Sequence, residues 1–444
     1  MRVKVLSRSK RKYTSDTKEV LQPIFHSKSK EAHPFLHERE YVRALNSTKL
    51  DKTFAKPLIG ALESHTDSIW CLQRHPIRIS TFFSGACDGD LVRWNISARM
   101  PLWTVKAHQG FVRGVALQRD GDHVLTCSDD CTVKMWEVDQ DESGSILPVH
   151  TWISPHSLRC VDCNPVVPLY ATGDTTMRLW DVNSTTPIQE LKFDMMDGEI
   201  AKLKFAPSEP HLVLACDTQR SMILYDTRAK KAIRRLTMKH ICNDIDWNPQ
   251  EPVNFIMASM DGNVYSFDMR NFKKAKTVHK DHMNSVQCCR FSPTGREFVS
   301  GSFDRTLRIW NSLDGRSRDV YHTRRMQRLF SVEFSGDGRF VLSGSDDTNI
   351  RIWKTRANMQ VKPMVRKERV KINYENQLKK KFGSVDQIRN IRRAHKLPKA
   401  LINAKRREHI QLESVTRKDR RRVDNGGRKV RQKEREAAIY EEGK

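Results

Sequence analysis

The sequence lacks long apolar runs and any recognisable export signal. No run of 18 apolar residues occurs among its 444 residues, so nothing in it predicts a membrane span. The first twelve residues are basic, but the apolar stretch of a secretory signal does not follow them. All ten cysteines lie between Cys71 and Cys289. We therefore expect reduced thiols in a nuclear or cytoplasmic protein without membrane association.

Motifs of the common enzyme classes are also missing. The chain has no G-x-x-x-x-G-K-[ST], no H-E-x-x-H, no G-x-S-x-G and no kinase-like set. Its one C-x-x-C, from Cys160 to Cys163, has no second pair to complete a zinc site. Counted from the proline that follows each strand, Cys71, Cys160 and Cys288 share one register, which favours a place in the core. We predict no enzyme, no catalytic residue, no metal and no cofactor.

Charge is distributed very unevenly. The formal net charge is +26, of which residues 1–60 carry +8 and residues 354–444 carry +18. Residues 61–353 are electrically neutral and contain all nine tryptophans. This pattern indicates a neutral folded body whose two ends bind a polyanion.

The neutral body is built from an internal repeat. Each copy has small residues, a turn that is opened in most copies by Asp, and alternating apolar residues that end in an aromatic, as in Asp304-Arg-Thr-Leu-Arg-Ile-Trp310. The terminal aromatics stand 42 to 45 residues apart, at Trp94, Trp136, Trp180, Tyr225, Phe267, Trp310 and Trp353. Seven copies at this period predict an all-β fold, a seven-bladed WD40 β-propeller with basic, partly helical extensions.

Two further features of the repeat lead to predictions. A histidine lies upstream of the terminal aromatic in six copies, at His65, His108, His150, His240, His282 and His322. In WD-repeat families such histidines commonly join Ser or Thr, Asp and Trp in a hydrogen-bonded network. The segment 58–62 precedes the first copy, and we expect it to pair with the last blade and close the ring.

Two neighbouring copies end in aromatic-Asp-x-Arg, at Tyr225-Asp-Thr-Arg228 and Phe267-Asp-Met-Arg270. The pattern resembles the motif with which cullin-4 ligase receptors dock their adaptor. The resemblance makes Asp226, Arg228, Asp268 and Arg270 candidates for binding that adaptor. The alternative is an Asp–Arg pair that only completes the end of the blade.

The N-terminal arm contains a candidate helix and a basic cluster. Tyr41, Leu45 and Thr48 or Lys49 are spaced as on one face of a helix. The residues of the arm that we expect to contact a partner are Arg8, Lys10, Arg11, Lys12, Arg39, Tyr41 and Arg43.

The C-terminal segment predicts three helices. Tyr374, Leu378 and Phe382 form an apolar stripe, which ends at Gly383. Ser384 and Gln387 form a possible capping box for a second helix, and Pro398 suits the first turn of a third. Beyond about residue 412 the pattern fades, and we expect a disordered tail.

The basic clusters of this segment have two interpretations. In the first, they form a solvated face or an import signal. In the second, they bind the phosphates of RNA, with an affinity that falls as the salt concentration rises. The excess of one sign favours RNA, although no RRM or KH signature supports base-specific reading. The expected contact residues are Lys379, Lys380, Lys381, Arg392, Arg393, His395, Lys399, Lys405, Arg406 and Arg407.

The two flanks resemble a known family. The segments that carry the resemblance are Met1 to Arg8, His33 to Phe35, Arg39 to Leu50, Phe54 to Pro57, Tyr321 to Gln327, Tyr374 to Phe382 and His395 to Lys399. They are similar to the suppressor-of-fibrillarin WD-repeat family. The resemblance implies a scaffold of the small-subunit processome in the nucleolus of the nucleus, required for pre-rRNA processing to 18S rRNA. It implies pre-rRNA, guide snoRNP and other processome proteins as partners. Some members are described as cullin-4 ligase receptors, which is the alternative function.

These observations predict four parts. They are a basic arm with a short helix over 1–56, the propeller over 57–354, a basic helical extension over 355–412 and a disordered basic tail over 413–444.

Overall fold

The computed structural model describes residues 35–139, 146–191, 198–229, 231–361, 363–426 and 439–443. They form two compact units. One contains residues up to Phe54 together with Gln360–Arg393, and the other contains Ala55–Met359 together with Ala394 onward.

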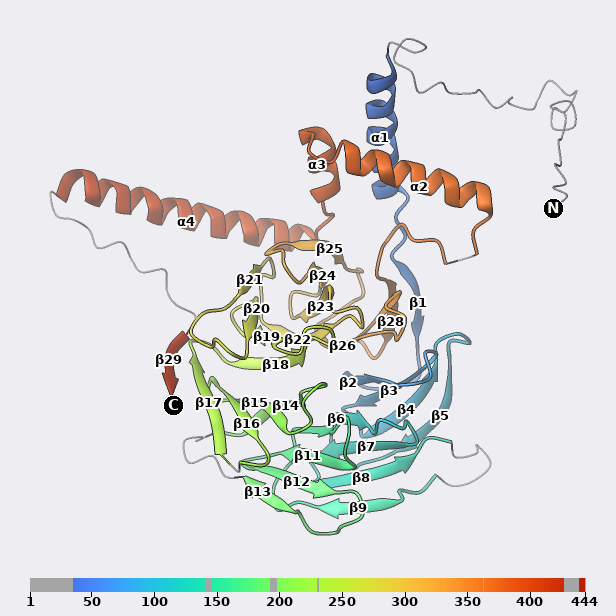
Figure 1. The fold of residues 1–444 in the computed structure, drawn as a ribbon, viewed down its shortest axis with the longest axis vertical. Coiled ribbons are helices and arrows are strands. Elements are labelled where there is room, and N and C mark those ends of the chain that lie inside the picture. Colours follow the sequence, from blue (N-terminus) through green and yellow to red (C-terminus); the bar gives the residue numbers. More distant parts are fainter. Residues whose placement is uncertain are drawn as a thin grey trace, which may run out of the picture. The chain divides into compact units, whose positions relative to one another are not determined.

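The larger unit contains seven antiparallel sheets in a ring, the blades of a β-propeller (Figure 1); six have four strands and one has five. The predicted seven-bladed propeller is confirmed. In chain order the strands of the first three complete blades are β2 (Ile69–Arg74), β3 (Thr81–Ala86), β4 (Asp90–Asn95), β5 (Met100–Lys106); β6 (Val112–Leu117), β7 (His123–Ser128), β8 (Thr132–Glu137), β9 (His150–Ile153); β10 (Cys160–Cys163), β11 (Leu169–Gly173), β12 (Met177–Asp181) and β13 (Gln189–Leu191).

The next three blades follow the same up-and-down order. Their strands are β14 (Ile200–Phe205), β15 (Leu212–Asp217), β16 (Ser221–Asp226), β17 (Lys231–Met238); β18 (Cys242–Trp247), β19 (Asn254–Ser259), β20 (Asn263–Asp268), β21 (Thr277–Lys280); β22 (Val286–Phe291), β23 (Glu297–Ser302), β24 (Leu307–Asn311) and β25 (Ser317–Tyr321).

The last blade closes the ring with strands from both ends of the repeat region. It consists of β26 (Leu329–Phe334), β27 (Phe340–Ser345), β28 (Ile350–Lys354) and β1 (Leu58–Leu62). β1 pairs antiparallel with β28, with Leu62 opposite Ile350. The predicted closure by residues 58–62 is therefore confirmed, and the pairing leaves no open edge on β28.

Small residues permit the close packing that the repeat requires. A Cβ atom added to Gly301 would lie 2.7 Å from Cys288 Sγ and 2.8 Å from Val332 Cγ2 of the next blade. Glycine is therefore needed where neighbouring blades approach most closely.

The terminal aromatics are buried, as the repeat predicts. Trp94, Trp136, Trp310 and Trp353 are at most 2% exposed. The indole N–H of Trp310 donates to Ser300 Oγ at 2.7 Å, and that of Trp136 donates to Thr126 Oγ1 at 3.0 Å. Each indole thus fills the blade with apolar surface and has its one donor satisfied.

Among the described residues, the predicted histidines form the network in three blades. His65, His108 and His282 lie within 2.9 Å of the Ser or Thr that binds the tryptophan. His108 and His282 also bind Asp130 and Asp304, each at 2.9 Å. In these blades the prediction is confirmed.

The prediction is wrong for the other three histidines. His150 and His240 are exposed, and His322 lies 3.0 Å from the backbone oxygen of Lys396. In the blade of β10, Ser154 and Arg178 bind Asp174 in place of a histidine. The upstream spacing varied by several residues from copy to copy, so it did not distinguish network histidines from loop histidines.

The described part of the chain contains four helices besides the strands: α1 (Leu36–Thr53), α2 (Arg366–Lys381), α3 (Asp386–Arg393) and α4 (Lys399–Gly426). The predicted helices at Tyr41, at Tyr374 and after Pro398 are present. α4 runs through 413–426, which we expected to be disordered, and β29 (Ile439–Gly443) pairs with β17. The rest of that expected tail, 427–438 and 444, lies outside the described residues. Among the described residues no helix is long and apolar enough to cross a membrane.

Candidate functional site: the terminal helices, the blade ends and the central channel

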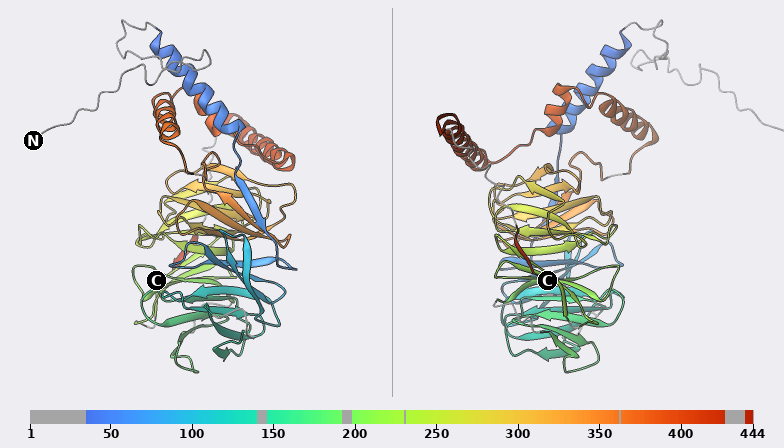
Figure 2. Two further views of the ribbon diagram at one scale, coloured as in Figure 1. Left: turned by 90° about the vertical axis from the view of Figure 1, so that its right-hand side faces the viewer. Right: turned by 60° about the vertical axis from the view of Figure 1, so that its left-hand side comes forward.

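The first candidate site is the smaller unit, which α1, α2 and α3 build together (Figures 1 and 2). We call these three helices the terminal helical unit. Ala44 of α1, Leu378 of α2 and Ile388 of α3 are at most 5% exposed and pack with Phe382. The apolar stripe that the sequence showed on α2 is thus covered by the N-terminal helix, 330 residues earlier in the chain.

Polar contacts join the same helices. The Tyr41 hydroxyl donates to Gln387 Oε1 at 2.8 Å, and Arg43 Nη1 donates to the Tyr374 hydroxyl at 3.2 Å. Gln387, which we placed in a capping box with Ser384, accepts from Tyr41 instead. Tyr41 and Arg43 thus hold the unit together, and the contact with a partner that we expect of them stays a prediction.

Two of the three clustered lysines on α2 are paired within the unit. Lys379 forms an ion pair with Asp51, and Lys381 Nζ lies 2.6 Å from Glu40 Oε2. Lys380, between them, is exposed. The basic cluster therefore divides into residues that join α2 to α1 and one that faces solvent.

Several predicted contact residues remain on the surface. The exposed ones of the C-terminal segment that form no ion pair with another described residue are Lys380, Arg392, Arg393, Lys399, Arg406 and Arg407. We call these six the exposed basic set. Lys405 Nζ lies 3.4 Å from Asp281 Oδ1 of the propeller, and His395 is half-buried. Arg39 is exposed on α1, while Arg8, Lys10, Arg11 and Lys12 lie outside the described residues.

The second candidate site is the pair of aromatic-Asp-x-Arg ends on β16 and β20. The Asp226 and Asp268 carboxylates each accept a hydrogen bond, at 2.9 Å, from the backbone N–H of the arginine two positions on. Arg228 Nε also lies 3.6 Å from Asp226 Oδ1, so the Asp–Arg pair of the alternative forms at this blade end. The side chain of Arg228 is nevertheless 68% exposed, and Arg270 is exposed as well. The aspartates therefore complete a turn, and both guanidinium groups remain accessible.

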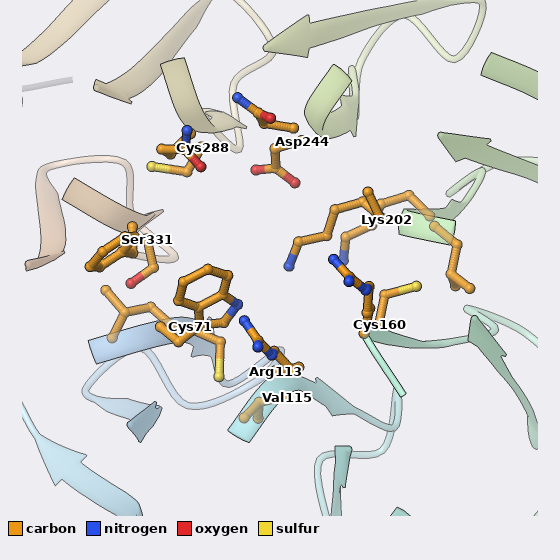
Figure 3. Close-up of a pocket in the computed structure, with 18 of the residues that line it drawn as sticks. Cys71, Arg113, Val115, Cys160, Lys202, Asp244, Cys288 and Ser331 are labelled. Atoms are coloured by element: carbon orange, nitrogen blue, oxygen red, sulfur yellow. The ribbon is translucent and has the colours of Figure 1, made fainter. Parts of the chain in front are cut away.

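The third candidate site is the central channel. In six inner strands the register with the neighbouring strand shifts by one residue, so one side chain per strand is left out of the ladder. The side chains at these bulges are Trp70, Arg113, Ala201, Asn243, Gln287 and Phe330. With Arg159 of the remaining blade they line a cavity of about 240 Å³ (Figure 3).

A ring of alternating charge surrounds the channel. In five successive blades the same strand position carries Asp162, Lys204, Asp246, Arg290 and Glu333. Lys204 Nζ lies 2.8 Å from Asp162 Oδ1, and Arg290 lies 2.9 Å from Asp244 and 3.5 Å from Glu333. Four of the five charges of the ring thus have a partner of opposite sign, and the Asp246 carboxylate accepts a hydrogen bond of 2.6 Å from the backbone N–H of Phe291.

Burial shifts the titration of this ring. It raises the pKa of Asp246 and of Glu333 above their usual values. Burial alone would lower the pKa of Lys204, but the Asp162 carboxylate beside it raises that pKa. We did not predict this ring, although the alignment that placed Cys71, Cys160 and Cys288 in register places these charges two residues further on.

The cysteines occupy the expected places beside the channel. Cys71, Cys160 and Cys288 stand at one strand position and are buried. Burial raises the pKa of the Cys71 thiol to about 12, and it raises that of Cys160 further. Among the residues that the structure describes, no three His, Cys, Asp or Glu side chains are grouped to hold a metal ion.

Comparison with known proteins places this fold and these extensions in one class. Residues 355–439 match the Sof1-like domain, and residues 99–137, 273–311 and 321–354 match the WD domain, G-beta repeat. The WD40 β-propeller domain of Doa1 aligns with a TM-score of 0.58 at 19% identity, covering 67% of this chain and 96% of that domain, which supports the fold. The class is a WD-repeat scaffold or adaptor.

Relatives extend over nearly the whole chain. The protein named DDB1- and CUL4-associated factor 13 is 40% identical in Dictyostelium discoideum, over 96% of this chain and 95% of the relative. It is 38% identical in Xenopus tropicalis, over 94% of each chain, and 37% identical in Homo sapiens, over 95% of each. The chain therefore belongs to the Sof1-like family of WD-repeat proteins.

Proposed function

We propose that this protein is a non-enzymatic scaffold of the small-subunit processome in the nucleolus. In this role it binds pre-rRNA, with its guide snoRNP and other processome proteins, and supports processing to 18S rRNA. Its family membership and the charge excess of +18 over residues 354–444 support the proposal.

The observation that carries the proposal is that some basic residues form ion pairs within the terminal helical unit, whereas others are exposed to solvent. Lys379 and Lys381 are neutralised by Asp51 and Glu40, so they contribute little to an external field. The exposed basic set has side chains in solvent. Arginine and lysine side chains of this kind bind phosphates and release counterions, which gives sequence-independent affinity for RNA.

The test must spare the core of the terminal helical unit. Deleting residues 366–444 would remove α2 and α3 and expose the apolar face of α1, so loss of function would be ambiguous. Replacing Arg392, Arg393, Arg406 and Arg407 with Gln removes four charges from exposed positions only.

The variant is compared with the wild type for co-sedimentation with pre-rRNA particles and for 18S rRNA production. Arg296→Gln combined with Arg339→Gln, two exposed propeller positions, is the control. We expect the fourfold variant to leave the particles and the control to remain. Normal sedimentation and normal 18S production in the fourfold variant would refute the proposal.

A second candidate function is that of a substrate receptor for a cullin-4 RING ubiquitin ligase. The exposed guanidinium groups of Arg228 and Arg270 favour it, as does the name of the relatives, DDB1- and CUL4-associated factor 13. Replacing both arginines with Ala keeps Asp226 and Asp268 as turn acceptors, since their hydrogen bonds come from the backbone. We expect the adaptor DDB1 to co-purify with the wild type and not with this variant, whereas equal recovery would exclude docking through these arginines.

A further inference from the structure

The mouth of the central channel carries an aromatic shelf. Trp70 of β2 and Phe330 of β26 stack with ring centroids 5.0 Å apart and an interplanar angle of 27°. The Arg113 guanidinium, from the blade on the other side of Trp70, lies 4.7 Å from the Trp70 ring centroid. Trp70 and Phe330 are the extra residues of their bulges and are half-buried, so the shelf is fixed by the backbone of two blades.

Beside the shelf, the ammonium group of Lys202 has no anionic partner among the described residues. Arg113 is paired with Asp129 at 2.7 Å, and Arg159 is paired with Glu199. Lys202 extends toward the middle of the cavity (Figure 3), and it forms no ion pair with any residue in the described part of the chain. The cavity therefore has room and charge for one further anionic group.

In the blade next to that of Lys202, one buried acceptor has no donor among the described residues. Asp244 is 2% exposed, and its Oδ2 accepts from Arg290 Nη1 at 2.9 Å and from the backbone N–H of Cys289 at 3.0 Å. Asp244 Oδ1 is buried, lines the cavity and accepts no hydrogen bond from the described residues. Buried polar atoms are normally paired, so this oxygen is suited to a donor from outside the chain.

We propose that the channel mouth binds an extended acidic peptide segment of a protein partner. A carboxylate of the segment pairs with Lys202, and a backbone N–H of the segment donates to Asp244 Oδ1. An apolar side chain next to the acidic residue packs against the open edges of the half-buried Trp70 and Phe330 rings. This interaction does not rest on the proposed function, because it uses none of the exposed basic set.

A peptide fits these features better than a nucleic acid does. Trp70 is covered from one neighbouring blade by Arg113 and from the other by Phe330, so it offers no open ring face to a base. The arginines at the mouth are paired with Asp129 and Glu199, so they offer no net positive charge to a row of phosphates. A single free lysine suits one carboxylate, and extended backbone supplies the N–H that Asp244 lacks.

The experiment uses the full chain and an array of nine-residue peptides with central Glu, each paired with a twin that has Gln. Lys202→Gln removes the charge, and Lys274→Gln, at an exposed position, is the matched control. We expect the wild type and the control to prefer Glu over Gln on peptides with an apolar neighbour. Lys202→Gln should reduce that preference about fivefold or more.

Two further measurements distinguish binding at the channel from binding at the basic ends of the chain. Trp70→Leu, whose melting temperature is checked first, should remove the requirement for an apolar neighbour. Binding of a twelve-nucleotide oligo(U) should be equal in the wild type and Lys202→Gln. A Glu preference that is absent, or that survives in Lys202→Gln, would overturn the proposal. An equal loss of RNA binding would overturn it as well and assign the channel to RNA.

Discussion

The hydroxyl of Tyr41 donates a hydrogen bond of 2.8 Å to Gln387, 346 residues further along the chain. This contact joins an N-terminal helix to a C-terminal one across the sequence of the whole propeller. The two extensions are therefore not independent arms: their helices share a core of Ala44, Leu378, Phe382 and Ile388.

The shared core predicts that truncating Phe382 releases α1. Phe382→Ala removes a ring that is 4% exposed and contacts Tyr41, and changes of this type cost about 3 to 5 kcal/mol. We expect faster hydrogen exchange in α1 and α2, with no change in the propeller strands. Val370→Ala, at a position on α2 that is 63% exposed, serves as the control and should leave exchange unchanged. Equal protection of α1 in both variants would contradict the shared core.

The hydrogen-bonded network within the blades predicts that removing the hydroxyl of Ser300 destabilises the protein. Ser300 Oγ lies 2.7 Å from both His282 Nε2 and Trp310 Nε1 and is fully buried. Ser300→Ala leaves buried polar groups without a partner, so it should lower the free energy of unfolding by about 1 to 3 kcal/mol. Urea unfolding measures this, with the exposed Ser64→Ala as control. A loss no larger than that of the control would show that the network contributes nothing to stability.

The charge ring predicts a penalty for removing one partner. Lys204→Met leaves the Asp162 carboxylate, 9% exposed, without its 2.8 Å ion pair. Breaking a buried pair in this way costs about 3 to 5 kcal/mol, whereas replacing both charges costs much less. Lys204→Met combined with Asp162→Leu should therefore be more stable than Lys204→Met alone. If the double variant is the less stable of the two in urea, the pairing account is wrong.

Buried histidines predict a loss of stability in mild acid. Burial lowers the pKa of His65 and of His279 from 6.5 to about 4. Because the unfolded chain takes up these protons first, stability is complete above pH 6.5 and falls as the pH drops toward 4. Each histidine should contribute a loss of about 1 to 2 kcal/mol by pH 5.

Urea unfolding at pH 7 and pH 5 checks this dependence. His279→Asn should reduce the difference between the two pH values, while His240→Asn, at an exposed position, should not. An unchanged difference in His279→Asn would rule out a contribution from that residue.

The blades were predictable because each repeats a local pattern. Trp310, Gly301 and Asp304 perform the same roles as their counterparts in other blades, so seven copies reinforced one inference. The positions of α1, α2 and α3 relative to one another were not predictable. Tyr41 and Phe382 are far apart in the sequence, and the pattern of residues within each helix does not indicate that their apolar faces pack against each other.

The roles of the basic residues were predictable only in part. Charge and spacing identify Lys379, Lys380 and Lys381 as one cluster, but pairing with Asp51 and Glu40 is decided by tertiary contact. The channel residues Lys202 and Asp244 were missed for a related reason. They stand in different blades, and closure of the ring brings them to one cavity.

The central claim is that the exposed basic set contacts the RNA of a pre-ribosomal particle. Protein–RNA crosslinking in cells, with the crosslinked peptides sequenced, tests it most directly. The account predicts crosslinks from pre-rRNA or snoRNA to residues 380–407, concentrated at Arg392, Arg393, Arg406 and Arg407. Crosslinks absent from this segment in particles that contain the protein would contradict it.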